Sequence, residues 1–116
     1  MGKIINKAIL ESISSFKIYS LSIDLYDQTY AIFPCADPLL KKVPENIKFI
    51  TLPKNIIVTE TIISGIDSYS GTSSILFYPD GTQEPAEIFV TDLSENKNYE
   101  IILKPYSLSP EVSSYE

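Results

Sequence analysis

The chain has 116 residues, of which 44% are hydrophobic and 21% are charged, and this balance predicts one globular domain with a single core. It contains no histidine, which excludes Ser-His-Asp and Cys-His catalytic sites and histidine-ligated metal sites. It also contains no arginine and has a formal net charge of −6. We therefore expect no nucleic-acid partner, because such partners are held mainly by Lys and Arg.

The first expected element is an α-helix over about residues Lys3–Leu25. Apolar residues recur there at steps of three and four, and no Gly or Pro interrupts the pattern. The stripe comprises Ile5, Ile9, Ile13, Phe16 and Ile23. Because β-branched residues lower helix propensity, we expect this helix to lie on a sheet.

The second half of this helix has a competing interpretation. Lys17–Leu25 can instead form a strand that pairs with Thr29–Phe33 across the intervening Tyr26-Asp27-Gln28. The alternation of apolar and polar residues in Lys17–Leu25 fits a half-buried strand only weakly. We therefore favour the helix.

The middle of the chain predicts strands separated by irregular segments. Gln28–Phe33 alternates and stops at a proline, and the proline-rich segment 34–53 contains a short candidate strand at Ile47–Leu52. Lys54–Ile63 is rich in Ile, Val and Thr, and a Ser-Gly pair ends it. We expect Ile66–Thr72 to be an exposed loop.

The last third of the chain predicts a three-stranded antiparallel meander. Its strands are Ser74–Tyr78, Glu87–Asp92 and Tyr99–Lys104, each with apolar residues on one face. At most one further short edge strand is expected, around Glu111–Ser113. The predicted fold class is α+β, with a long N-terminal helix packed on antiparallel β-sheet.

Two turns of the meander carry acidic residues. We interpret Pro79, Asp80 and Gly81 as a structural turn, in which Pro fixes φ, Asp accepts local hydrogen bonds and Gly takes a positive φ. The loop 92–96 offers oxygen atoms of the kind that Ca²⁺ binds, but it lacks the ligand spacing of an EF-hand. We interpret this loop as a plain turn.

No residue is a strong candidate for catalysis or for cofactor binding. Glu84 and Glu87 are predicted to be solvated carboxylates at a hairpin tip, and Lys41-Lys42 is predicted to be a solvated loop pair. Cys35 is the single cysteine and is interpreted as a packing residue, since it cannot form an intramolecular disulfide. We expect no enzyme activity, no metal and no cofactor.

The order of elements and several motifs resemble the soluble domain of type IV pilin-like proteins. Within that group the chain is most similar to minor pseudopilins of type II secretion of the H type and to related minor pilins. The matching segments are SLSIDLYDQTYAIFP at the helix-to-strand junction, TLPKNIIVTE, the hairpin SSILFYPDGTQEPAEIFVTD with its Phe-x-Pro-Asp-Gly, and NYEIILKPYSLSPEV at the end. The chain departs from the family at Ser107–Pro110, where the family usually has Thr-Gly before its last strand.

The resemblance implies a single pilin-like domain over residues 1–116, whose helix continues upstream as an apolar segment inserted in the inner membrane. Ile4, Ile5, Ala8 and Ile9 would then lie where this stem leaves the domain, and other pseudopilin or pilin subunits would be the partners. The implied role is structural, in a type II secretion pseudopilus or a type IV pilus. The implied location is the periplasm or a cell-surface filament.

Two other functions are compatible with the sequence. A secreted or surface module could bind a protein or a carbohydrate through exposed tyrosines, of which Tyr69, Tyr78, Tyr106 and Tyr115 are the candidates. A minor pilin for DNA uptake would have the same expected fold, but the acidic balance disfavours it.

Overall fold

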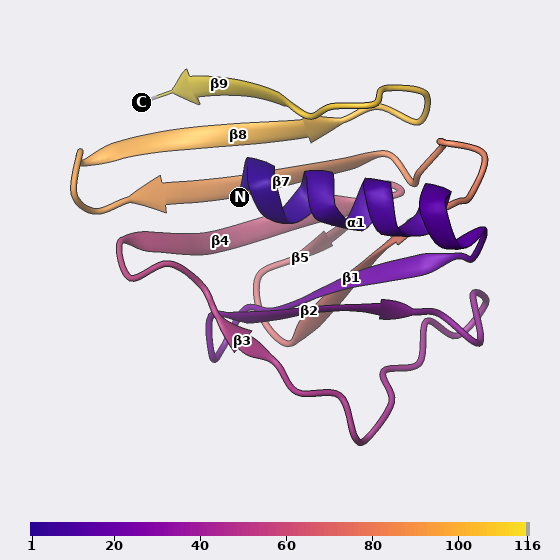
Figure 1. The fold of residues 1–116 in the computed structure, drawn as a ribbon. Helices are drawn as coiled ribbons and strands as arrows, with labels where there is room; N and C mark the ends of the chain where they lie inside the picture. Colours follow the sequence, from indigo (N-terminus) through magenta and orange to yellow (C-terminus); the bar gives the residue numbers. More distant parts are fainter. Residues whose placement is uncertain (116) are drawn as a thin grey trace.

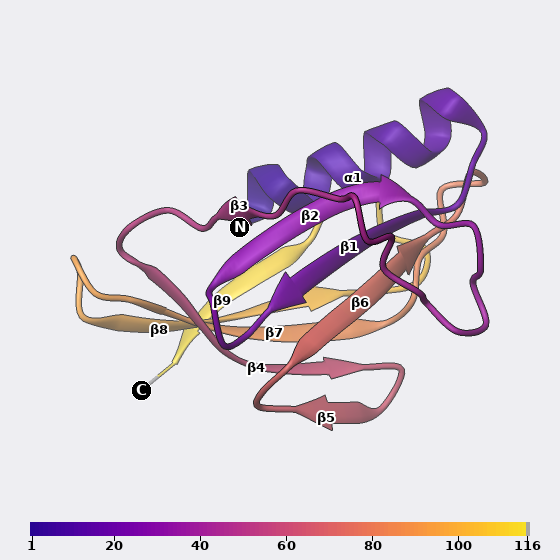
Figure 2. The same ribbon diagram turned by 90° about the horizontal axis from the view of Figure 1, so that it is seen from below.

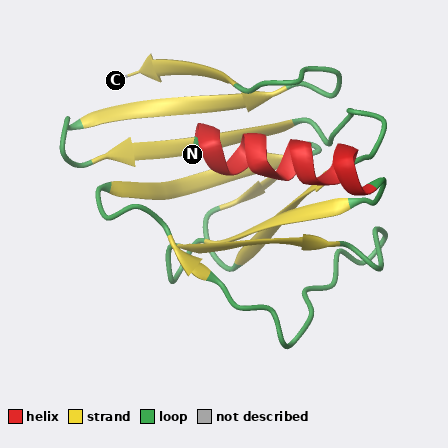
Figure 3. Cartoon of the chain, in the orientation of Figure 1, coloured by secondary structure: helices red, strands yellow, loops and turns green. Residues whose placement is uncertain are grey.

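The computed structural model describes residues 1–115 and has a mixed α+β fold, with one N-terminal helix and two antiparallel sheets (Figures 1 and 3). The helix α1 is Gly2–Ser15. The strands are β1 (Tyr19–Asp24), β2 (Thr29–Pro34), β3 (Ile50–Thr51), β4 (Ile56–Ile63), β5 (Ile66–Ser68), β6 (Thr72–Phe77), β7 (Ala86–Asp92), β8 (Lys97–Leu103) and β9 (Glu111–Tyr115). One sheet has the strand order β3-β2-β1-β6 and the other β5-β4-β7-β8-β9.

The helix is shorter than predicted, and its extension to Leu25 is wrong. Phe16 takes the left-handed conformation with φ of 57°, which ends α1. The chain then forms β1, which pairs with β2 on one side and with β6 on the other. The strand interpretation of Lys17–Leu25, with a partner at Thr29–Phe33, is the correct one.

Both faces of β1 are buried, and for this reason its sequence lacks the alternation that indicates a half-buried strand. Leu21 and Ile23 are fully buried on one face, and Ser20 and Ser22 on the other face are at most 1% exposed. The Ser22 and Ser74 hydroxyls lie 2.7 Å apart, which satisfies polar groups that have lost water. In the sequence these serines therefore look like the solvent-exposed face of a strand, although both are buried.

The C-terminal meander is composed of different strands from those predicted. β7, β8 and β9 pair consecutively, whereas β6 pairs with β1 in the other sheet. The apolar faces follow the predicted alternation, since Ile75, Phe77, Ile88, Val90, Ile101 and Leu103 are all buried. The chain passes from one sheet to the other after β6.

The remaining strands differ from the predictions mainly at their ends. The predicted strand Ile47–Leu52 is reduced to β3, and part of the expected loop 66–72 is the edge strand β5. A turn with positive φ at Ser64 and Gly65 connects β4 to β5. The last strand, β9, continues to Tyr115.

The core lies between α1 and the two sheets, which are set at an angle to each other (Figures 1 and 2). Its largest fully buried side chains come from α1 and from both sheets. They include Ile5, Leu21, Ile23, Val58, Ile75, Phe77, Ile88 and Leu103. Each such side chain contributes about 1.5–3 kcal/mol of transfer free energy.

A glutamine also ties the two sheets together. The side-chain amide of Gln28, in the turn between β1 and β2, donates to the carbonyl of Val58 at 2.9 Å and accepts from its N–H at 2.8 Å. Val58 lies beside a register shift in β4, where a strand loses its regular partners. In the described part of the chain, no helix is long and apolar enough to cross a membrane.

Candidate functional site

The two carboxylates singled out in the sequence do not form a solvated pair. Glu84 Oε1 accepts from Lys41 Nζ at 2.7 Å and from the Leu76 N–H at 2.9 Å. Its other oxygen accepts from the Ser64 hydroxyl at 2.9 Å, and its side chain is only 13% exposed. Lys41 Nζ also donates to the Ser74 carbonyl at 3.0 Å. The predictions of a solvated Glu84 and of a solvated Lys41 are therefore wrong.

We call Glu84, Lys41 and Ser64 the Glu84 clamp. It joins β6 of the four-stranded sheet, the turn after β4 of the other sheet, and the segment 35–49. Because both Glu84 oxygens are hydrogen-bonded within the fold, the clamp has a structural role. Glu87 follows Pro85 in the sequence as the second residue of β7, and it is not part of the clamp.

The structure places Pro79, Asp80 and Gly81 in a tight turn after β6. Asp80 Oδ1 accepts from the Thr82 hydroxyl at 2.6 Å and from the Thr82 N–H at 3.0 Å. These bonds, above all the one from the hydroxyl, lower the pKa of the Asp80 carboxyl. Gly81 has φ of 91°, a conformation that side chains disfavour. The bonding is internal to the turn.

The loop 92–96 is organised in the same way. Asp92 Oδ1 accepts from the Ser94 hydroxyl at 2.6 Å and from the N–H groups of Ser94 and Glu95 at 2.9 and 3.3 Å. The hydroxyl contact is the main cause that lowers the pKa of Asp92. Within residues 1–115, no group of three or more Asp, Glu, His or Cys side chains is placed to hold a metal ion.

The helix residues assigned to an assembly role face the core. Ile5, Ala8 and Ile9 are at most 3% exposed, and Ile4 is partly buried against the same cluster. In this structure their side chains stabilise the domain and do not present a surface to a partner. The large apolar side chain that α1 does expose is Leu10, at 66%.

The four candidate tyrosines do not share a surface. Tyr69 follows the edge strand β5, whereas Tyr115 belongs to β9 at the opposite edge of the same sheet. Tyr115 packs edge-on against Phe89, with ring centroids 6.0 Å apart. Tyr106 lies in the loop after β8, and Tyr78 is half-buried. No common binding face follows from them.

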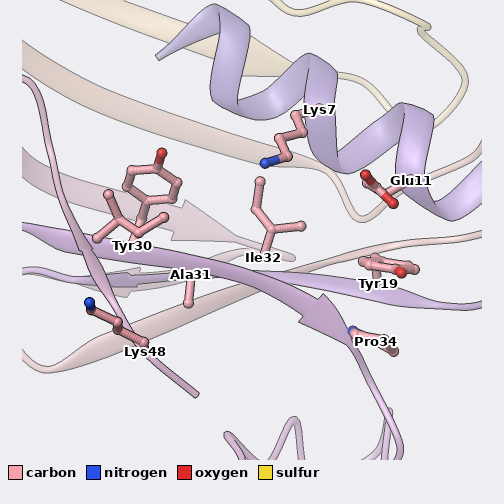
Figure 4. Close-up of a pocket in the computed structure, with 9 residues that line it drawn as sticks. Lys7, Glu11, Tyr19, Tyr30, Ala31, Ile32, Pro34 and Lys48 are labelled. Atoms are coloured by element: carbon pink, nitrogen blue, oxygen red, sulfur yellow. The ribbon is translucent and has the colours of Figure 1, made fainter.

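The β2 groove, which no sequence pattern indicated, lies between α1 and the outer part of β2 and has a volume of about 280 Å³ (Figure 4). Lys7 from α1 points into the groove, and Lys48 approaches from the segment before β3. Glu11 lies at the other end, over Tyr19 (Figure 4). The lining residues are Lys7, Glu11, Tyr19, Tyr30, Ala31, Ile32, Pro34, Lys48 and Ile50.

The edge of β2 that borders the β2 groove has no partner strand beyond Tyr30. β3 pairs with β2 only at Thr29 and Tyr30. The Cys35 N–H bonds to the Ile18 carbonyl at 2.8 Å across the β1–β2 pair. In an antiparallel ladder the backbone groups of successive residues point to opposite sides, so the N–H and C=O of Ile32 point away from β1. They point to the open edge of β2, where Ile32 lines the groove.

The outer face of the five-stranded sheet is acidic. Direct pairing places Glu60 opposite Phe89, Phe89 opposite Glu100, Glu87 opposite Ile102, and Ile102 opposite Glu111. Asp67 joins them from β5, opposite Ile62. A hydrogen bond with Asp67 is the main cause that raises the pKa of Glu60. The acidic face thus consists of Glu60, Asp67, Glu87, Glu100 and Glu111.

No protein-family model, no curated protein and no solved structure matched the chain in our comparisons.

Proposed function

We propose that the chain is the soluble domain of a minor pseudopilin or minor pilin, and that it acts as a structural subunit of a periplasmic pseudopilus or of a type IV pilus. In this role it is anchored in the inner membrane through a helix upstream of α1. Its partners are other pilin-like subunits. It carries out no chemistry of its own.

The observation that carries this proposal is the order of the elements together with the sequence motifs that they contain. A helix comes first and packs across two antiparallel sheets, and the Phe-x-Pro-Asp-Gly motif forms the turn after β6. The sequence resemblance to H-type minor pseudopilins concerns the same segments. Although α1 ends at Ser15 and not at Leu25, it is still the first element in the described fold.

A feature at the start of α1 also supports the proposal. An apolar hollow of about 170 Å³ lies beside Met1 and Gly2, over the five-stranded sheet. Its other lining residues are Ile56, Val90, Tyr99, Ile101 and Val112. A further turn of helix upstream of α1 would cover this surface and bury it.

The test is an in-frame deletion of the full-length gene in its own bacterium, with complementation. We expect loss of type II secretion or of pili, restored by the full-length gene and not by a gene that encodes residues 1–116 alone. Unchanged secretion and piliation would contradict the proposal. So would a full-length gene that encodes no apolar stretch of about 20 residues upstream of Lys3.

A further inference from the structure

We propose that the β2 groove binds an extended acidic segment of a partner protein. The segment adds a short strand to the free edge of β2 and places a carboxylate between Lys7 and Lys48. This binding does not depend on the filament role, because it follows from the backbone and the charges of the groove alone.

The backbone supplies the first requirement. The N–H and C=O of Ile32 point to the open edge of β2, since β3 pairs with β2 no further than Tyr30, and Ile32 lines the groove. Within residues 1–115, no turn or loop hydrogen bond engages these groups. An unpaired strand edge is a template for an added strand, whose main-chain bonds supply affinity. Because Pro34 has no N–H, this edge can pair over only a short length.

The charges supply the second requirement. Lys7 and Lys48 line the groove from different elements, and neither takes part in an ion pair with residues 1–115. In a chain with a net charge of −6, two unpaired cations in one groove favour an anionic occupant. Glu11 lies at the Tyr19 end, so the carboxylate is expected at the Tyr30 end.

The apolar lining supplies the third requirement. Ile32 and Ile50 form apolar parts of the wall, and Ile50 is 53% exposed. A bound strand presents alternate side chains to opposite faces, so every second residue of the segment contacts these walls. The volume of about 280 Å³ lies just below the usual range of ligand pockets, which begins at about 300 Å³. The occupant is therefore a short segment, held weakly.

The occupant is a partner rather than this chain's own tail. β9 already pairs with β8 up to Tyr115, so the described C-terminal residues are engaged elsewhere. The acidic loop 92–96 is also closed on itself by the bonds of Asp92. Neither of these acidic segments is free to fill the groove, which favours an occupant from another protein.

The test is an NMR titration of the ¹⁵N-labelled chain with a five-residue peptide of alternating valine and glutamate. We expect the amide resonances of Ile32 and its β2 neighbours to shift, and the Ile32 amide to exchange more slowly with solvent. The same peptide with lysine in place of glutamate, and a version methylated on alternate backbone nitrogens, should each bind at least about tenfold more weakly.

Two double variants that change the net charge by the same amount distinguish a local effect of the groove lysines from a general effect of net charge. Lys7→Glu/Lys48→Glu should weaken binding at least about tenfold, whereas Lys42→Glu/Lys54→Glu, which changes exposed lysines outside the groove, should leave it nearly unchanged. All four lysines are exposed, so each variant is expected to fold.

The proposal would be overturned by shifts that avoid β2, by equal binding of the methylated peptide, or by equal loss of binding in both double variants. Shifts of Ile32 that depend on protein concentration without peptide would assign the groove to a second copy, which also contradicts the proposal.

Discussion

The two sheets use the same kinds of residue in different surroundings. In the four-stranded sheet both faces of β1 are buried, with Leu21 and Ile23 on one face and Ser20 and Ser22 on the other. In the five-stranded sheet one face packs on the core, and the other carries Glu60, Asp67, Glu87, Glu100 and Glu111 toward solvent. Polar residues on the outer face of the five-stranded sheet therefore face solvent, whereas the polar residues Ser20 and Ser22 of β1 are buried and Ser22 is hydrogen-bonded to Ser74.

This difference explains which strands could be predicted. β7 and β8 alternate between apolar and polar residues because only one of their faces is buried, so their positions were predicted correctly within a few residues. The sequence of β1 favours a helix because its buried serines do not look like a core face. The predicted partner of β6 is also wrong, because alternation indicates which face of a strand is buried and not which strand lies beside it.

The largest predicted effect contrasts a buried and an exposed isoleucine, one in each sheet. Ile23→Ala in β1 should lower the free energy of unfolding by about 2–5 kcal/mol, because Ile23 is fully buried. Ile66→Ala in β5 should change it by no more than about 0.5 kcal/mol, because Ile66 is 70% exposed. Urea denaturation measures both values. A small effect of Ile23→Ala would place β1 outside the core.

A smaller loss is expected from opening the Glu84 clamp. Glu84→Gln removes the charge that receives Lys41, and it should lower the free energy of unfolding by about 1–3 kcal/mol. The matched variant on the acidic face, Glu87→Gln, should stay within about 0.5 kcal/mol of the original chain. Chemical denaturation at low and high salt measures the difference. Equal effects of the two variants would show that Glu84 is solvated.

The serine pair between β1 and β6 should have a measurable coupling. Ser22→Ala leaves the Ser74 hydroxyl without its 2.7 Å partner and should cost about 1 kcal/mol. Since Ser74→Ala removes the same bond, the double variant should cost less than the sum of the single variants. A double-mutant cycle by denaturation measures the coupling. Strict additivity would mean that the two hydroxyls do not interact in solution.

The smallest effect concerns Glu60 on the acidic face, for which we predict the direction in which stability changes with pH. The pKa of Glu60 is raised above its ordinary value of 4.5, mainly by a hydrogen bond with Asp67. The folded state therefore holds this proton more tightly than the unfolded state. The resulting stability is fully present below the ordinary pKa and is lost as pH rises through the folded value.

Glu60→Gln removes this proton linkage. Unfolding midpoints in urea should fall less steeply above pH 4.5 in the variant than in the original chain, so the variant should gain relative stability toward neutral pH. The exposed, acidic Glu45→Gln, which lies outside the acidic face, serves as the control and should leave the slope unchanged. Parallel slopes for all three chains would mean that Glu60 and Asp67 ionise independently.

The β2 groove could not be predicted, for a related reason. Lys7 and Lys48 are far apart in the chain, and only the separation of β3 from β2 beside Ile32 brings the free edge and the two cations together. Similarly, the clamp of Glu84 with Lys41 depends on where the segment 35–49 lies on the four-stranded sheet. The turns at Asp80 and Asp92 were predictable, because the hydrogen bonds that these two carboxylates accept come from residues two or three positions away.

The most direct test of a role in filament assembly is to find where the full-length protein resides in the cell. Filaments are sheared from the cells, after overproduction of the system where needed, and are collected by centrifugation. The pellet is then probed with an antibody against residues 1–116. We expect the protein in the filament pellet in small amounts, and its loss from the pellet when the gene for the major subunit is deleted. A protein found only in the soluble fraction, unaffected by that deletion, would contradict the proposed function.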